Sequence, residues 1–145
     1  MIIPDDDGSE ALFMLDTNTA SFIMRRASGL RERLSTIPAS RLSISVMTEA
    51  ELRFGAAKAP NREKLLALIE NFLAHVRVLP WTSKVAAEYG VLRFTLAKSG
   101  RSLGNMDMLI AAHAKAVGAV LVSNDAALLR LAPLVKVVDW TAPAA

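Results

Sequence analysis

The sequence predicts an α/β protein with a small central parallel sheet whose two faces are covered by helices. The chain has 145 residues, which is close to the commonest size of one domain. Short apolar runs alternate along it with helical patterns, and Gly, Pro or helix-capping residues separate them. Helical crossovers are the connections that parallel strands need. We therefore expect one domain over residues 11–140, with a disordered leader at 1–10 and a C-terminal tail at 141–145.

The first half of the chain predicts two strands followed by helices. The apolar run Ala11–Leu15 stops at Asp16, a residue type that caps helices, so a strand and then a helix are expected. A second strand is expected at Arg41–Ser45. Two helices follow it, at Val46–Lys58 and at Asn61–Ala74. In the first of these, the apolar side is predicted to carry Met47, Ala50, Phe54 and Ala57.

The second half repeats the alternation. A strand at Val76–Leu79 is closed by a proline, and an apolar stripe at helical spacing then predicts an amphipathic helix. That stripe consists of Val85, Tyr89, Leu92 and Leu96. After a glycine-bracketed turn come an almost entirely apolar helix, a strand, a short helix following Asp125 and a final strand. Their expected ranges are Met106–Val117 for the apolar helix, Ala119–Ser123 for the strand and Lys136–Val138 for the final strand.

The composition excludes several classes of site. The chain has no cysteine and only two histidines, so disulfides, thiolate nucleophiles and Cys/His zinc sites are excluded. Any metal ion must be held by oxygen. His113 lies within the apolar helix, where we interpret it as a hydrogen-bonded core side chain. The N-terminal residues lack a basic region followed by an apolar stretch, and charges interrupt the longest apolar run, so we expect a cytoplasmic protein that does not span a membrane.

The body of the chain is more basic than its formal charge of +3 indicates. The leader contains four acids and no basic residue, so the remainder carries +7. This excess suits an anionic polymer such as nucleic acid, although a solvated basic surface explains it equally well. The arginines that we consider as phosphate contacts are Arg25, Arg26, Arg53 and Arg101.

Three acids are predicted to lie at the carboxyl ends of strands or at the start of helices, where ligands of open parallel sheets collect. Asp16 directly follows the first strand, and Asp125 comes two residues after the strand that ends at Ser123. Asp107 falls in the first turn of the apolar helix. Each of the three also has a purely structural explanation, because a carboxylate at a helix N-terminus stabilises the helix as a cap by about 0.5–2 kcal/mol.

A fourth acid, Glu51, lies in the middle of the helix over Val46–Lys58, where no cap is needed. Periodicity does not choose between it and Glu49, because the two flank the apolar stripe about equally. Gly55 lies one turn after Glu51 on the same face, which leaves room for a substrate to approach but also simply weakens a helix.

Five stretches of the chain together resemble the PIN domains of VapC-type toxins in order and spacing, over about Leu12 to Trp140. They are MLDTN at Met14–Asn18, SVMTEAELRFG at Ser45–Gly55, AAEYGVLRFTLAKSGRSLGNMDMLIAAHA at Ala86–Ala114, GAVLVSND at Gly118–Asp125 and VKVVDW at Val135–Trp140. The resemblance implies a three-layer α/β/α domain.

The resemblance also implies which acids share a site. The family's motif positions fall on Asp16, Glu51, Asp107 and Asp125. A hydroxyl near the last acid falls on Ser123 and the polar residue of the DTN motif on Asn18, as supporting residues. Because the motif ELxxG begins at Glu51, that residue rather than Glu49 is implied, and we expect Glu49 to be exposed.

Four carboxylates in one pocket require a counter-charge. Two like charges 4 Å apart repel by about 4 kcal/mol at an effective dielectric constant near 20. Mg²⁺ resolves such repulsion and prefers oxygen ligands, and Mn²⁺ is a possible substitute. We expect Asp16 and Asp107 to hold the ion, while Glu51 and Asp125 position the attacking water or help to bind a second ion.

The implied activity is that of a metal-dependent endoribonuclease, the toxin of a type II toxin–antitoxin pair. The implied partners are an RNA substrate such as tRNA or another structured RNA, a VapB-like antitoxin and a second copy of the chain. One alternative is a catalytically silent PIN-like module that only binds RNA or antitoxin. A phosphatase-like hydrolase ranks lowest, because such enzymes pair their aspartate nucleophile with a second aspartate two residues later, where this chain has Asn18.

Overall fold

Five strands form one sheet in the order β3-β2-β1-β4-β5, and every neighbouring pair is parallel. The computed structural model describes residues 11–25 and 36–141, so the predicted leader and all but the first residue of the predicted tail lie outside the described residues. The strands are β1 (Phe13–Leu15), β2 (Leu42–Ser45), β3 (Arg77–Leu79), β4 (Val120–Val122) and β5 (Val137–Val138). The predicted parallel α/β sheet is confirmed, with strand ends one or two residues shorter than expected.

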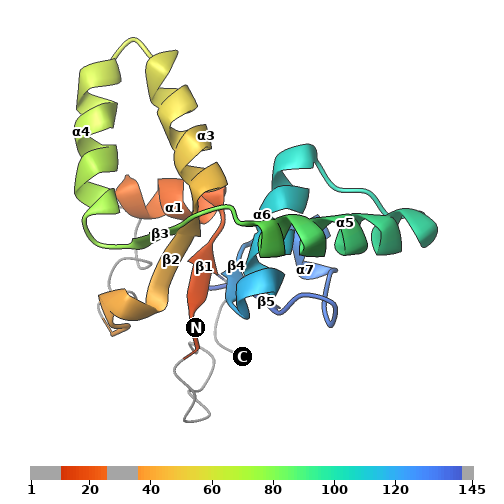
Figure 1. Ribbon diagram of the computed structural model, residues 1–145. Helices are drawn as coiled ribbons and strands as arrows, with labels where there is room; N and C mark the ends of the chain where they lie inside the picture. Colours follow the sequence, from red (N-terminus) through yellow and green to blue (C-terminus); the bar gives the residue numbers. More distant parts are fainter. Residues whose placement is uncertain (1–10, 26–35, 142–145) are drawn as a thin grey trace.

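Helices connect the strands as predicted (Figure 1). They are α1 (Thr17–Met24), α3 (Val46–Ala57), α4 (Arg62–Leu73), α5 (Ser83–Lys98), α6 (Asn105–Val117) and the short α7 (Ala126–Leu129), with a 3₁₀ turn, η1, at Ala39–Arg41. Two pairs of helices, α3 with α4 and α5 with α6, pack side by side. None of the helices in the described ranges is long and apolar enough to cross a bilayer.

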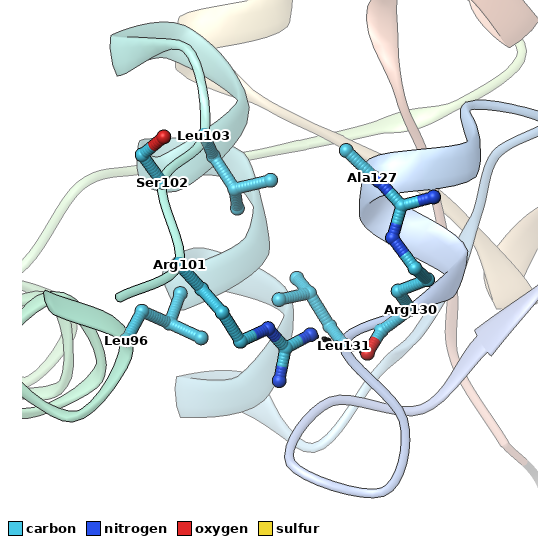
Figure 2. A pocket seen from close by; sticks show the side chains of 7 residues that line it. All are labelled: Leu96, Arg101, Ser102, Leu103, Ala127, Arg130 and Leu131. Atoms are coloured by element: carbon cyan, nitrogen blue, oxygen red, sulfur yellow. Dashed lines mark hydrogen bonds between the residues drawn. The ribbon is translucent and has the colours of Figure 1, made fainter. Parts of the chain in front are cut away.

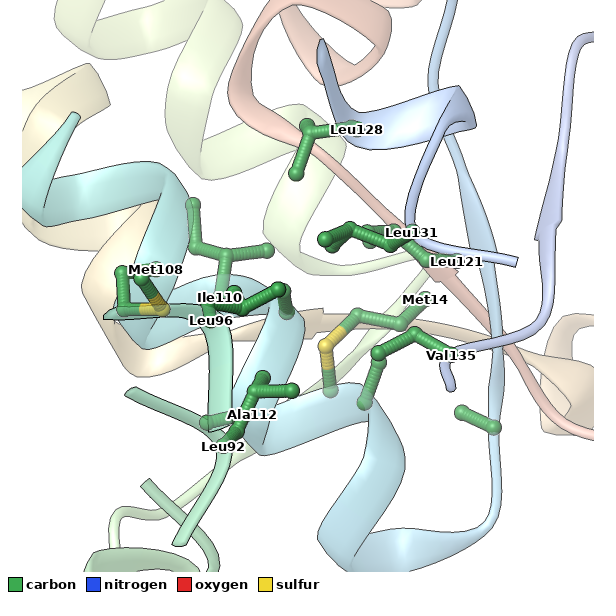
Figure 3. Close-up of a cluster of buried hydrophobic side chains, with 13 residues drawn as sticks. Met14, Leu92, Leu96, Met108, Ile110, Ala112, Leu121, Leu128, Leu131 and Val135 are labelled. Carbon is green, nitrogen blue, oxygen red and sulfur yellow. The ribbon is translucent and has the colours of Figure 1, made fainter. Parts of the chain in front are cut away.

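The central strand β1 separates two hydrophobic clusters, which makes the domain three-layered. Phe13 and Leu15 point into a cluster with α1, α3 and α4, where Trp140 packs edge-on against Phe13 at a ring distance of 5.1 Å. Met14 points to the opposite face, into a cluster with α5, α6 and α7 (Figure 3). The alternation follows from the two-residue period of a strand. The expected α/β/α arrangement is therefore confirmed.

The amphipathic patterns were right for α5 and wrong for α3. Along α5, Val85, Leu92 and Leu96 are buried, as their spacing predicts. Along α3, the buried face instead consists of Thr48, Leu52 and Ala56, at four-residue spacing. Phe54, which hydrophobicity places on the buried side, is 66% exposed and packs under the ammonium of Lys58.

The parallel register brings the carboxyl ends of the three inner strands level with one another. Leu15 at the end of β1 pairs with Ile44 of β2 and with Val122 of β4. The residues that follow these strands therefore emerge at one edge of the sheet. This edge is where Asp16 lies.

Candidate active site

Asp16 lies at the end of β1 and is only 3% exposed. Its backbone N–H donates to the carbonyl of Val122 at 3.0 Å, which ties it to β4. Its Oδ1 accepts a hydrogen bond from the backbone of Thr19 at 2.8 Å, so it is the N-cap of α1. The capping explanation is therefore right for Asp16. Within the described residues, no other hydrogen bond engages its carboxylate.

Glu51 projects from the middle of α3 toward the start of α1. The hydroxyl of Thr17 donates a hydrogen bond to its Oε1 and also lies 3.4 Å from the hydroxyl of Thr48. A single threonine thus holds the carboxylate that periodicity alone did not select. Thr17 was not among the residues predicted for the site. Its position directly after Asp16, the acid that follows the first strand, is the feature of the sequence that could have indicated it.

Glu49 belongs to a different part of the surface. Its Oε2 lies 2.7 Å from Nε of Arg53, and the same guanidinium lies 2.9 Å from Glu70 on α4. These two hydrogen-bonded carboxylates raise the pKa of Arg53. Glu49 was expected to be simply exposed, and this was wrong, because its side chain is 24% exposed and pairs with Arg53 on the same helix, while Arg53 joins α3 to α4 through Glu70. The ion pair also accounts for Arg53, so its guanidinium is already engaged by protein carboxylates.

Asp107 lies in the first turn of α6 and is electrostatically coupled to all three other predicted acids. Burial raises its pKa, and the negative charges of Asp125, Asp16 and Glu51, in that order, raise it further. Each of these three carboxylates acts on Asp107 across space, and the segments that follow β1 and β4 emerge at the same edge of the sheet.

Asp125 and Ser123 form the fourth side of this cluster. The Oδ1 of Asp125 caps α7 by accepting from the backbone of Leu128 at 3.1 Å. The buried hydroxyl of Ser123 accepts from the backbone N–H of Asp125 at 3.0 Å. This bond fixes the turn that presents the carboxylate. Ser123 therefore lies where a supporting residue was expected, and its observed contact is to the backbone.

A groove of about 870 Å³ runs between α1, α3 and α4, and of the four acids only Glu51 is in its lining. Thr17 and Asn18 line it as well, together with Lys58 and Lys64. Asn18 is exposed here, so its amide faces the groove. Arg25 also lines it, whereas Arg26 lies outside the described residues.

The donor chemistry of the cluster fits a hard divalent cation. All of the potential ligands are carboxylate or hydroxyl oxygens, and the pKa of Asp107 is raised by its burial first and by three neighbouring carboxylates second. In the parts of the chain that the structure describes, no three acidic or histidine side chains converge tightly enough to hold an ion between them. Mg²⁺ suits this arrangement, because it usually takes one or two carboxylates and keeps several waters.

The comparisons with known proteins agree with one another. The family model described as PIN domain matches residues 13–134. The chain is 37% identical over 129 residues to the tRNA(fMet)-specific endonuclease VapC of Salmonella typhimurium, covering 88% of this chain and 97% of the relative. It is 38% identical over 115 residues to ribonuclease VapC2 of Haemophilus influenzae, covering 78% and 86%.

Solved structures point the same way. The DNA-bound VapBC complex of Salmonella typhimurium contains a chain that matches with a TM-score of 0.84 and 35% identity, covering 90% of this chain and 98% of that one. VapBC2 of Rickettsia felis, bound to a promoter DNA fragment, matches with a TM-score of 0.83 and 29% identity, covering 89% and 98%. The chain therefore belongs to the PIN-domain family and, within it, to the VapC ribonucleases.

Proposed function

We propose that this chain is the toxin of a type II toxin–antitoxin pair and that it hydrolyses RNA phosphodiester bonds with the help of a divalent metal ion. The observation that carries the proposal is the match to the PIN-domain model and to VapC ribonucleases over most of the chain, with Asp16 at the carboxyl edge of the parallel sheet. The names of the curated relatives support RNA as the substrate, with tRNA or another structured RNA as its class.

Asp16 and Asp107 would hold the ion, with Mg²⁺ as the cation and Mn²⁺ as its substitute. Asp16 is suited to this role because the cap bond to Thr19 and the backbone bond to Val122 immobilise it. When bound, the ion supplies Lewis-acid chemistry, lowering the pKa of water and neutralising charge at the phosphate.

Glu51 and Asp125 then orient the attacking water and accept its proton. Thr17 keeps Glu51 in position, and Ser123 keeps the turn before Asp125 in position. Asn18, exposed in the groove beside them, contacts the substrate. Since water rather than the ribose 2′-hydroxyl attacks, the products carry 3′-hydroxyl and 5′-phosphate ends.

The groove between α1, α3 and α4 is the proposed seat of a VapB-like antitoxin. Its walls carry apolar side chains such as Leu65 and Leu68, and Glu51 lies at its inner end. An apolar segment with a basic residue at that end matches both features. The VapBC complexes among the structural relatives support such a partner.

Pairing of two copies is proposed through the outer face of α5, where Val91 and Phe94 are 60% and 66% exposed. We propose the cytoplasm as the place of action.

The test is cleavage of defined RNA oligonucleotides and tRNA by the purified chain, with Mg²⁺ or Mn²⁺ and with a chelator. Asp16→Asn and Asp107→Asn are compared with Glu63→Gln, a charge-matched change on exposed α4. We expect the wild type and Glu63→Gln to cleave RNA and the two aspartate variants not to cleave it. Induced expression should arrest growth with the wild type and Glu63→Gln and not with the two aspartate variants. Cyclic phosphate ends would contradict the proposed chemistry. A wild type that binds RNA or antitoxin but never cleaves would favour the silent binding module.

A further inference from the structure

A second, smaller cavity lies between the α5–α6 loop and α7, and two arginines frame it (Figure 2). Its volume is about 160 Å³, and its apolar lining comes from Leu96, Leu103 and Leu131. Arg101 reaches across it from the loop, and Arg130 contributes from the end of α7. Drug-sized ligands occupy cavities of about 300–1,000 Å³, so this space suits a small group rather than a bulky one.

The position of Arg101 is fixed by the way α5 ends. Gly100 adopts a left-handed conformation with φ +72°, and its N–H bonds the carbonyl of Ala97 at 3.0 Å. The N–H of Arg101 bonds the carbonyl of Leu96 at 2.8 Å, which completes a Schellman motif. The Arg101 guanidinium then donates to the carbonyl of Arg130, the residue that ends α7. This bond holds the loop to α7. It uses one of the five N–H donors of the Arg101 guanidinium.

Within residues 11–25 and 36–141, no carboxylate neutralises either guanidinium. Among the described residues, the ion pairs engage Arg53 and Lys115 with carboxylates, whereas Arg101 and Arg130 pair with none. Both arginines are exposed, and they line a cavity that leucine side chains also line. Two unpaired guanidiniums at a small, partly apolar cavity form an anion site.

This cavity lies beside α7, the helix that Asp125 caps. Arg130 follows Asp125 by five residues along α7, so its backbone is displaced from the cap by about 7.5 Å along the axis. On the other side of the loop, a cavity of about 190 Å³ is lined by Arg101, Arg93 and Asn105, the last lying two residues before Asp107. The arginines therefore lie on the side of the sheet covered by α5, α6 and α7, which also carries Asp107, and away from the groove of α1, α3 and α4.

We propose that Arg101 and Arg130 bind a backbone phosphate of the RNA next to the one that is cleaved. The inference rests on the proposed nuclease function and adds a substrate contact to it. A planar guanidinium binds phosphate oxygens in pairs, and the cavity admits a phosphate but not a folded peptide segment. Bound in this way, the strand would be held in register while the cleaved bond lies over the acids.

The experiment uses the full-length protein with Mg²⁺ and a cleavable RNA. Arg130→Gln is the principal variant, because among the described residues its side chain makes no bond that the fold would lose. Arg101→Gln and the double variant are measured beside it. Arg77→Gln, an exposed arginine on the opposite edge strand β3, is the matched control. We expect KM to rise about 5- to 20-fold for each single variant with kcat within about twofold, as uniform binding predicts.

The salt dependence supplies a second readout. Each lost contact to single-stranded RNA should reduce the slope of log K against log salt by about 0.7, and Arg77→Gln should leave it unchanged. If Arg130→Gln and the double variant have the same KM and the same salt slope as the wild type, the phosphate site is wrong, although the proposed nuclease function is unaffected. If Arg130→Gln weakens antitoxin binding and leaves KM unchanged, the cavity serves a protein partner and the inference is wrong.

RNA binding separates the two proposals. Kd is measured for the metal-free wild type, for Asp16→Asn and for Asp16→Asn combined with Arg130→Gln. If the wild type never cleaves RNA, the proposed function fails. The phosphate site is then still judged by whether Arg130→Gln raises the Kd of binding at least fivefold, and an unchanged Kd overturns it.

Discussion

The Nδ1 atom of His113 lies 2.7 Å from the hydroxyl oxygen of Ser45, deep between the helix that carries Asp107 and the helix that carries Glu51. The same hydroxyl accepts the backbone N–H of Met47 at 3.0 Å and caps α3, so its single proton is available to the imidazole. The sequence-based interpretation of His113 as a hydrogen-bonded core side chain is confirmed, because it is fully buried. This contact fixes the spacing of two walls of the acid cluster.

His113 should make the fold less stable in mild acid. Burial lowers its pKa from the ordinary 6.5, and a backbone contact with Pro80 opposes that effect only in part. The unfolded chain therefore binds a proton more readily than the native protein, and the free energy of unfolding should fall as the pH drops below about 6.5. Urea denaturation of the metal-free protein at pH 7.5 and 5.5 measures this. His113→Gln should lose about 1–3 kcal/mol at pH 7.5 and show a smaller acid-dependent fall. Parallel pH dependence in both proteins would contradict the assignment.

The pKa of Asp107 should respond to its neighbours in a defined order. Burial is the main cause of its elevation, followed by the charges of Asp125, Asp16 and Glu51. Among the three single substitutions, Asp125→Asn should therefore lower the pKa of Asp107 most, and Glu51→Gln should lower it least. Carboxyl NMR titration of the metal-free protein measures the shift, with Glu63→Gln as a control expected to leave it unchanged. An Asp107 titration that ignores all three substitutions would show that the acids do not share a site.

Neutralising Asp107 should stabilise the metal-free protein while abolishing its activity. The native pKa of Asp107 lies above the ordinary 3.8, so the native protein binds this proton more readily than the unfolded chain does. The resulting stabilisation is fully present below pH 3.8 and is lost as the pH rises through the native pKa. Asp107→Asn should thus have a higher Tm than the wild type in chelator at pH 7. Millimolar Mg²⁺ should raise the Tm of the wild type by ligand linkage and leave the variant nearly unchanged. Cleavage should fall by more than about 100-fold, beyond the loss typical of outer-shell residues. A variant less stable than the wild type would argue against electrostatic strain at this residue.

Thr17 should act as a positioning residue for Glu51. Thr17→Val keeps the shape of the side chain but removes the hydroxyl that holds the carboxylate, so we expect kcat to fall about 10- to 100-fold with little change in KM. Thr17→Ser keeps the hydroxyl and should restore most of the rate. Equal loss in both variants, or an equal loss of thermal stability, would indicate a packing role instead.

The sequence predicted the strands and helices well because their signals are local. Alternating elements, the stripe along α5 and the caps at Asp16 and Asp125 depend on spacing and residue type within a few positions. The buried face of α3 was not predictable in this way. Its Thr48 and Ala56 are small or polar, whereas its largest apolar residue, Phe54, points outward, so hydrophobicity favoured the wrong face.

The site was harder to predict for a different physical reason. Periodicity could not distinguish Glu51 from Glu49, and only the family motif favoured Glu51. The three-dimensional partners separate the two, since Thr17 holds Glu51 while Arg53 holds Glu49. Such contacts span more than thirty positions in the first case and arise from the register of the sheet, so no local pattern encodes them.

The position of β1 in the middle of the sheet has a consequence for how the toxin is made. Asp16 is synthesised early, but the strand before it is flanked on one side by β4, which is synthesised more than a hundred residues later. Asp125 follows later still. A growing polypeptide on the ribosome therefore cannot complete the proposed acidic site until β4 and Asp125 have been synthesised.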